Sequence, residues 1–144
     1  MFHSILMVCI GNICRSPMAD VLANTIYKEK QLNIASAGIA ALVGNAAAPY
    51  TIELLEKEYP DIRQHKARQL TTELITDFEL ILVMEKENLH AVHSLFPQTR
   101  GRVHLLGKWN DNEEIVDPYK KSKAHFEATF SAVERGVRTW KKYL

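Results

Sequence analysis

The stretch SILMVCIGNICRSP (residues 4–17) decides how this chain folds. The run from Ser4 to Ile10 is apolar after its first residue, which is typical of a strand buried on both faces of a parallel sheet. Gly11 and Asn12 interrupt that run, because both residues tolerate backbone conformations that strands do not use. Ser16 and Pro17 then favour a helix start, with Ser16 as the N-cap and Pro17 at the first helical position. The stretch therefore predicts a buried strand, a tight loop and a helix in direct succession.

Apolar strand-like runs and helical patterns alternate along the rest of the chain. This alternation predicts an α/β fold, a single-domain doubly wound four-stranded parallel sheet flanked by helices that spans residues 1–144. Ligands of such sheets bind beyond the carboxyl ends of the strands, which is where Cys9 lies. The predicted strands are 4–10, 33–36, 78–84 and 102–106, and the predicted helices are 16–26, 49–59, 85–95 and 122–143.

The composition is that of an ordinary water-soluble domain. The 144 residues are 47% hydrophobic and 24% charged, with a formal net charge of +1. That balance gives no general attraction to nucleic acid or to an anionic membrane, so an anion must be bound by a local site. The apolar N-terminal run is short and has no basic region before it, which argues against a signal peptide or a membrane span. We expect a cytoplasmic monomer whose two cysteines are reduced.

The segment from Cys9 to Ser16 has the features of an anion-binding loop. Backbone N–H groups before a helix have no helical acceptor and can converge on one anion, and the Arg15 guanidinium adds a fork of donors suited to phosphate. Cys9 lies where that anion would bind, and the same field favours a nucleophilic thiolate. The segment is not the nucleotide-binding P-loop, because no Gly-Lys-Ser/Thr follows. Two cysteines without further soft ligands also argue against zinc, so we expect neither a metal nor a cofactor.

A thiolate that attacks a phosphate ester needs an acid to protonate the leaving oxygen. Asp117 is the first candidate, since Pro118 stiffens the backbone after it and Tyr119 offers an aromatic face to a substrate ring. From the residues alone Asp117 could equally belong to a surface turn. The other acidic residues of the same loop, which stay open as alternatives, are Asp111, Glu113 and Glu114.

Four motifs together resemble one known family. They are VCIGNICRSP (residues 8–17), SAG (36–38), HKARQ (65–69) and DPY (117–119), in the family's order and spacing. On these motifs the chain is identified as a member of the low-molecular-weight protein tyrosine phosphatases. The stretches ALVG (41–44), MEK (84–86) and DPYKKS (117–122) resemble the bacterial branch associated with capsule and exopolysaccharide export.

The resemblance implies a role for each matching residue. Cys9 would be the nucleophile, Arg15 the phosphate ligand that stabilises the transition state, and Asp117 first the general acid and then the base that activates water. Ser16 would hydrogen-bond the thiolate, and Asn12 would hold the loop's shape through Ser36 and His65. The substrate would be a phosphotyrosine protein, bound by the loop residues Ile10, Gly11, Asn12, Ile13, Cys14 and Ser16 and by the pocket walls Leu42 and Tyr119.

Two departures from the family pattern bear on the substrate. A single tyrosine, Tyr119, follows Asp117 and is itself followed by Lys120 and Lys121, where many animal members have two adjacent tyrosines. Many members also have a large aromatic residue in the loop after SAG (36–38), where this chain has AALV (40–43), so we expect Leu42 to form the wall. A smaller wall and two lysines would suit an exposed, acidic, tyrosine-rich tail, such as the autophosphorylation cluster of a bacterial tyrosine kinase.

The sequence leaves two rival functions to weigh, and two alternative roles for Cys14. A thioredoxin-linked arsenate reductase would need further cysteines downstream, and none follows Cys14. A phosphate-reading protein without catalysis is disfavoured because Cys9, Arg15 and Asp117 are all present. Cys14 itself is open between packing beneath the loop and trapping an oxidised Cys9 as a disulfide.

Overall fold

The first strand lies inside the sheet with a parallel neighbour on each side. In the computed structural model, which describes residues 1–144, β1 (Ser4–Cys9) pairs with β2 (Asn33–Gly38) and with β3 (Leu80–Val83), and β4 (Val103–Leu105) extends the sheet beyond β3. The order is β2-β1-β3-β4, and every pairing is parallel. The predicted α/β fold with a four-stranded parallel sheet is confirmed.

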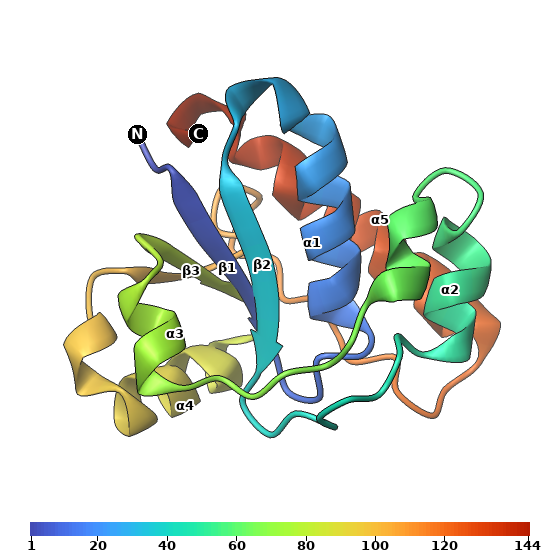
Figure 1. Cartoon of the computed structure of the whole chain (residues 1–144), viewed down its shortest axis with the longest axis horizontal. Coiled ribbons are helices and arrows are strands. Elements are labelled where there is room, and N and C mark those ends of the chain that lie inside the picture. Colours follow the sequence, from blue (N-terminus) through green and yellow to red (C-terminus); the bar gives the residue numbers. More distant parts are fainter.

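The alternation of side chains along β1 supplies both halves of the core. Ile5 and Met7 face a large cluster that includes residues of α1 (Arg15–Ile26) and α5 (Lys123–Thr139). Leu6 faces a smaller cluster on the opposite side, with residues of α3 (Thr72–Thr76) and α4 (Lys86–Leu95). Figure 1 shows these two pairs of helices on opposite sides of the sheet. The remaining elements are α2 (Pro49–Leu55) and the short 3-10 helices Lys28–Lys30, Pro60–Gln64, Pro97–Thr99 and Lys141–Tyr143.

The first helix begins one residue before the predicted start. It begins at Arg15, with Cys14 in the N-cap position, and Ser16 does not cap it. The reason is that the Ser16 hydroxyl is bonded to groups of the loop instead. The N-cap prediction for Ser16 was therefore wrong.

Other boundaries differ by a few residues. The helix predicted for 49–59 ends at Leu55, and residues 56–58 form a turn. Tyr59 leaves helical geometry before Pro60, where a 3-10 turn begins, because the residue before a proline avoids the helical region. The last helix ends at Thr139 and not at Tyr143. The sequence reading missed α3, a single short turn whose signal is the Thr71 side chain capping the N–H of Leu74.

The carboxyl ends of the strands gather at one edge of the molecule. From β1 the chain crosses to β2 on one side, and from β2 it crosses back over β1 to β3 on the other side. The winding direction therefore reverses beside β1, and α/β sheets bind ligands at such a point. Figure 1 shows the loop after β1 at the bottom, far from both termini.

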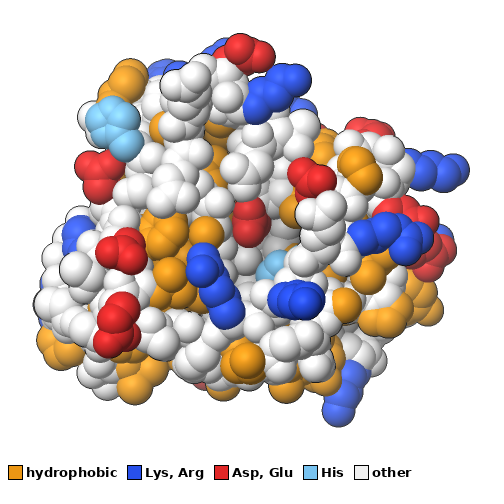
Figure 2. Space-filling view, in the orientation of Figure 1, with side chains coloured by type: hydrophobic (Ala, Val, Ile, Leu, Met, Phe, Trp, Pro, Cys, Tyr) orange, Lys and Arg blue, Asp and Glu red, His pale blue; other side chains and the backbone are white.

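On the face shown in Figure 2, Lys and Arg side chains are interspersed with Asp and Glu. None of the helices combines the length and the apolar character needed to cross a membrane.

Candidate active site

The loop between β1 and α1 is lined with unused hydrogen-bond donors. None of the backbone N–H groups from Ile10 to Ser16 donates to an acceptor in the protein. Buried N–H groups are rarely left without a partner, and a series of them at a helix start forms a concavity that suits an anion. Residues of this loop line a cavity of about 140 Å³. The loop thus has the free donors and the cavity that an anion site requires, and anion binding here stays a prediction.

The sulfur of Cys9 lies within this loop and has a hydrogen-bond partner. Cys9 is 3% exposed, and its Sγ lies 2.9 Å from the Ser16 hydroxyl oxygen. Ser16 accepts a hydrogen bond from the Asn12 side-chain amide at 2.7 Å, which leaves the hydroxyl hydrogen free to be donated to sulfur. A hydrogen bond donated to sulfur favours the thiolate over the thiol. Ser16 and Asn12 are fully buried beneath the loop and do not line the cavity.

Asn12 fixes the shape of the loop from below. Its φ of 58° lies in the left-handed region, which asparagine tolerates better than most residues. Its side chain donates to the Ser36 hydroxyl at 3.0 Å and accepts the backbone N–H of Arg68 at 3.0 Å. The backbone carbonyl of Asn12 accepts a hydrogen bond from Nε2 of the His65 ring at 2.6 Å, so Nε2 of His65 carries the proton. Burial lowers the pKa of His65, which keeps the ring neutral in this donor role.

Arg15 is a buried cation held by two acceptors that do not line the cavity. Its residue exposure is 1%, and one of its terminal nitrogens donates to Glu85 at 2.5 Å and to the carbonyl of Ile115 at 2.8 Å. Its Nε is buried and has no hydrogen-bond partner. A buried charge needs compensation, and Glu85 provides it. The unpaired Nε of a residue that lines the cavity is a donor available to an anion.

Sequence reasoning missed Glu85. It immediately precedes α4 and shares a capping box with Asn88, so its position is fixed by the helix that it caps. A signal did exist, because an acidic residue at the carboxyl end of the strand beside β1 lies at the predicted ligand-binding edge. What the sequence could not show is that its partner would be Arg15, 70 positions earlier.

The walls of the cavity come from three distant parts of the chain. Leu42 lies on one side, and its backbone N–H bonds the carbonyl of Gly11 at 3.1 Å. Asp117 and Tyr119 lie in the cavity wall contributed by the loop before α5. Oδ2 of Asp117 is 3.7 Å from the nearest Arg15 nitrogen, and Oδ1 accepts the N–H of Tyr119 at 3.1 Å. The cavity is lined by Cys9, Ile10, Gly11, Ile13, Cys14, Arg15, Ala40, Leu42, Asp117 and Tyr119.

The alternative acids lie outside this cavity. Glu113 is paired with Arg135 at 2.8 Å, and the hydrogen bonds from that guanidinium lower the pKa of its carboxyl group. Glu114 accepts the N–H of Lys86 at 2.7 Å, at the start of α4. Asp111 is exposed on the same loop and has no contact with the cavity. Asp117 is the only carboxylate that lines the cavity.

Cys14 is as deeply buried as Cys9. Both residues are 3% exposed and belong to the larger core cluster. Burial raises the pKa of its thiol to about 12, and the neighbouring Cys9 and Asp117 act in the same direction. Cys14 is therefore a protonated thiol at neutral pH. Its burial fits packing beneath the loop, and the alternative, trapping of an oxidised Cys9, stays untested.

Comparison with known proteins agrees with this geometry. The family model for the low molecular weight phosphotyrosine protein phosphatases matches residues 4–144. The chain belongs to this family. It is 41% identical over 144 residues to the low molecular weight protein-tyrosine-phosphatase Wzb of Salmonella typhimurium, covering 100% of this chain and 95% of that protein.

Solved structures of relatives have the same fold as this phosphatase. The tyrosine phosphatase AmsI of Erwinia amylovora matches with a TM-score of 0.90 at 41% identity, covering 100% of this chain and 94% of that one. Wzb of Vibrio vulnificus, solved in complex with benzylphosphonate, matches with a TM-score of 0.93 at 36% identity over 100% of both chains. This low molecular weight phosphatase is therefore a protein-tyrosine-phosphatase, and the arsenate reductase and non-catalytic readings are set aside.

Proposed function

We propose that the chain hydrolyses protein phosphotyrosine through a phosphocysteine formed on Cys9. The observation that carries the proposal is that one cavity contains the nucleophilic sulfur, the free loop donors, Arg15 and a single carboxylate, Asp117. The benzylphosphonate bound by the Vibrio vulnificus relative carries its phosphonate on a phenyl ring through a methylene group, where an aryl phosphate has an oxygen, which supports an aryl phosphate in the same cavity here. The apolar walls Leu42 and Tyr119 suit that ring.

In the first step the Cys9 thiolate attacks phosphorus. A sulfur–phosphorus bond forms as the bond from phosphorus to the tyrosine oxygen breaks, and Asp117 gives its proton to that oxygen. The free N–H groups of the loop and the Arg15 guanidinium bind the three non-bridging oxygens, where charge is spread in the transition state. The products are the substrate protein with an unphosphorylated tyrosine and the phosphatase with a phosphocysteine at Cys9.

In the second step water releases the phosphate. Asp117, now ionised, takes a proton from a water molecule whose oxygen attacks phosphorus from the side that the tyrosine left. The sulfur–phosphorus bond breaks, inorganic phosphate leaves, and the Cys9 thiolate is restored. The Ser16 hydroxyl stabilises that thiolate as the leaving group, since its hydrogen is available to sulfur.

Replacing Asp117 by Asn should slow the first step in proportion to how much the leaving oxygen needs a proton. For phenyl phosphate we expect kcat/KM to fall by about 10²-fold, in the range of general-acid contributions. For 2,4-dinitrophenyl phosphate, whose leaving group is stable as an anion, the loss should be slight. Asparagine keeps an acceptor for the N–H of Tyr119, so the turn should persist. The measurement is kcat/KM over a series of aryl phosphates.

The control measurement for Asp117→Asn is the inhibition constant of inorganic phosphate. It should equal that of the unmodified chain, because the loop donors are intact. An equal loss for every leaving group would show that Asp117 is not the acid.

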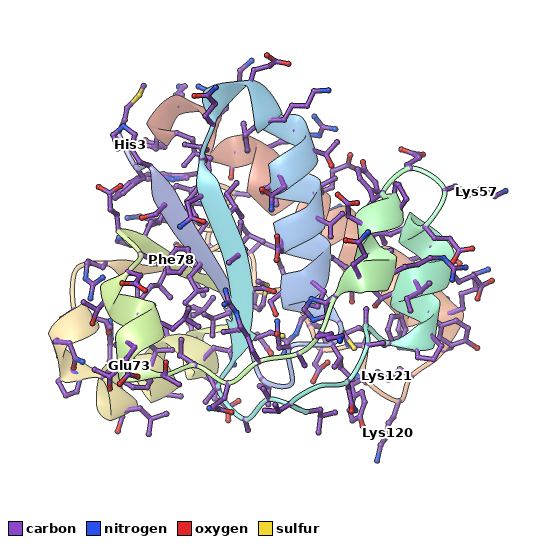
Figure 3. The ribbon with its side chains drawn as sticks, viewed as in Figure 1. His3, Lys57, Glu73, Phe78, Lys120 and Lys121 are labelled. Carbon is purple, nitrogen blue, oxygen red and sulfur yellow. The ribbon has the colours of Figure 1, made fainter.

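We further propose a cytoplasmic partner for this phosphatase, a bacterial tyrosine kinase with an acidic, tyrosine-rich tail linked to polysaccharide export. A nucleophilic cysteine stays reduced in the cytoplasm, which supports that location. Lys120 and Lys121 support the partner, since both are exposed and directly follow the cavity residue Tyr119. Figure 3 shows both lysines on the loop that leads into α5. The Lys120 ammonium lies 5.4 Å from the Tyr119 ring centre, at the rim of the cavity.

Phosphotyrosine peptides with acidic flanking residues should be cleaved faster than matched neutral peptides. We expect about a threefold higher kcat/KM at low salt, the size of an exposed ion-pair effect, and little difference at high salt. Changing Lys120 and Lys121 together to Gln should remove the preference. The control is the same change at Lys141 and Lys142, which are exposed at the far end of α5. Equal rates on both peptides with the unmodified chain would remove support for an acidic partner without affecting the catalytic proposal.

A further inference from the structure

The segment that carries Asp117 is a thin wall between two hollows. Asp117 lines the phosphate cavity on one side. On the other side it lines a second hollow, between this loop and α5, together with Val116 and Pro118. Pro118 is buried, but Val116 is exposed and Asp117 is only half-buried, so packing does not enclose Asp117 on both sides. Polar contacts must therefore help to fix its position.

One hydrogen bond joins residues 116–118 to the rest of the protein. Within residues 116–121, the N–H of Tyr119 bonds Asp117, and the N–H of Lys121 bonds the Pro118 carbonyl. The only hydrogen bond from residues 116–118 to the rest of the protein is donated by the Thr129 hydroxyl to the carbonyl of Val116, at 3.1 Å. The Asp117–Arg15 approach, at 3.7 Å, is an ion pair without hydrogen-bond geometry.

Thr129 is placed for this contact by the last helix. It is 6% exposed and belongs to the buried face of α5, one turn from Phe126 and Val133. A threonine inside a helix commonly bonds a carbonyl of the preceding turn of its own helix. Thr129 instead bonds a residue 13 positions earlier, outside the helix. Its hydroxyl thus connects the rigid helix to the residue before Asp117.

We infer that Thr129 is a positioning residue that holds Asp117 at the leaving oxygen, an inference that rests on the proposed role of Asp117 as the general acid. Proton transfer requires the carboxylate within hydrogen-bond reach of that oxygen, and small displacements of a catalytic group are costly. Without the Thr129 hydroxyl the segment would sample other positions above the second hollow. Thr129 touches neither the substrate nor Cys9, so the phosphate site itself should not change.

The test replaces Thr129 by Val, which keeps the shape and removes the hydroxyl. For phenyl phosphate we expect kcat/KM to fall about fivefold, a small part of the roughly 10²–10⁴-fold that a general acid contributes. For 2,4-dinitrophenyl phosphate, which needs no acid, and for the inhibition constant of inorganic phosphate, we expect no change. Thr129→Ser keeps the hydroxyl and should restore the rate on phenyl phosphate. The valine methyl group fills the space of the hydroxyl, and the carbonyl that loses its donor belongs to a residue that is 59% exposed, so the fold should persist.

Thr139→Val is the matched control, because Thr139 lies on the same helix and its hydroxyl bonds the carbonyl of Gly136 within that helix. It should leave every rate unchanged. If Thr129→Val does not fold, Thr129→Ala gives the same comparison. An equal loss for both leaving groups, no loss at all, or a Thr129→Ser variant as slow as Thr129→Val would each overturn the inference. Asp117→Asn tests the acid itself, so a selective effect there with none at Thr129 would reject only the positioning role.

Discussion

A chain carrying Cys9→Ser is expected to lose turnover by about 10⁴-fold or more, because a serine hydroxyl is scarcely ionised at neutral pH and oxygen is the weaker nucleophile. Serine is close in size to cysteine, and the buried site below the loop already accommodates a hydroxyl partner in Ser16. The free N–H groups of residues 10–16 and the Arg15 guanidinium remain in place. The variant should therefore bind inorganic phosphate nearly as well as the unmodified chain.

Two measurements made together check this result. Initial rates on para-nitrophenyl phosphate should fall to background, and titration calorimetry with phosphate should still give a binding signal. Loss of both would mean that the substitution disturbed the loop, and the experiment would then be repeated with Cys9→Ala. Retained turnover in both Cys9 variants, with loss in Cys14→Ser, would reverse the assignment of the nucleophile. The pKa of about 12 for the Cys14 thiol argues against that reversal.

The parts of the fold that the sequence predicted well are those whose signals are local. Residues 5–9 are apolar at both alternating sets of positions because both faces of the sheet are covered, and this pattern is visible without a structure. The loop after it could be identified because a glycine and an asparagine separate a buried strand from a helix. Ser16 shows the limit of such reasoning. Its position before Pro17 suggested a helix cap, but its hydroxyl is used by Cys9 and Asn12.

The parts that could not be predicted are contacts between residues far apart in the chain. Asp117 shares a cavity with Cys9, yet the proline and tyrosine that follow it made it only the first of several candidates, and the family resemblance was needed to single it out. Glu85 was missed because an acidic residue at a strand end has many solvent-exposed explanations, and its pairing with Arg15 depends on how β3 lies beside β1. Thr129 has no distinguishing local signal, since polar residues occur at the margins of most buried helix faces.

Arg15→Lys is expected to lower kcat/KM by about 10³-fold, close to the loss seen when a donor to a developing oxyanion is removed. The charge is retained, so the expected loss comes from geometry. One guanidinium nitrogen of Arg15 is held by Glu85 and by the Ile115 carbonyl, while Nε has no partner in the protein. A lysine ammonium is a single point of charge and cannot bind Glu85 and two phosphate oxygens at once.

The distinction between Arg15→Lys and Cys9→Ser lies in phosphate binding. Arg15→Lys should weaken inhibition by inorganic phosphate as well as the rate, because the same donors bind the ground-state anion and the transition state. Glu85→Gln is the matched variant: it keeps an oxygen acceptor for Arg15 but removes the compensating charge, and it should cost less than Arg15→Lys. Thermal unfolding of each variant separates a misplaced guanidinium from a destabilised fold. Unchanged phosphate inhibition in Arg15→Lys, with a folded chain, would mean that the loop amides bind the phosphate without Arg15.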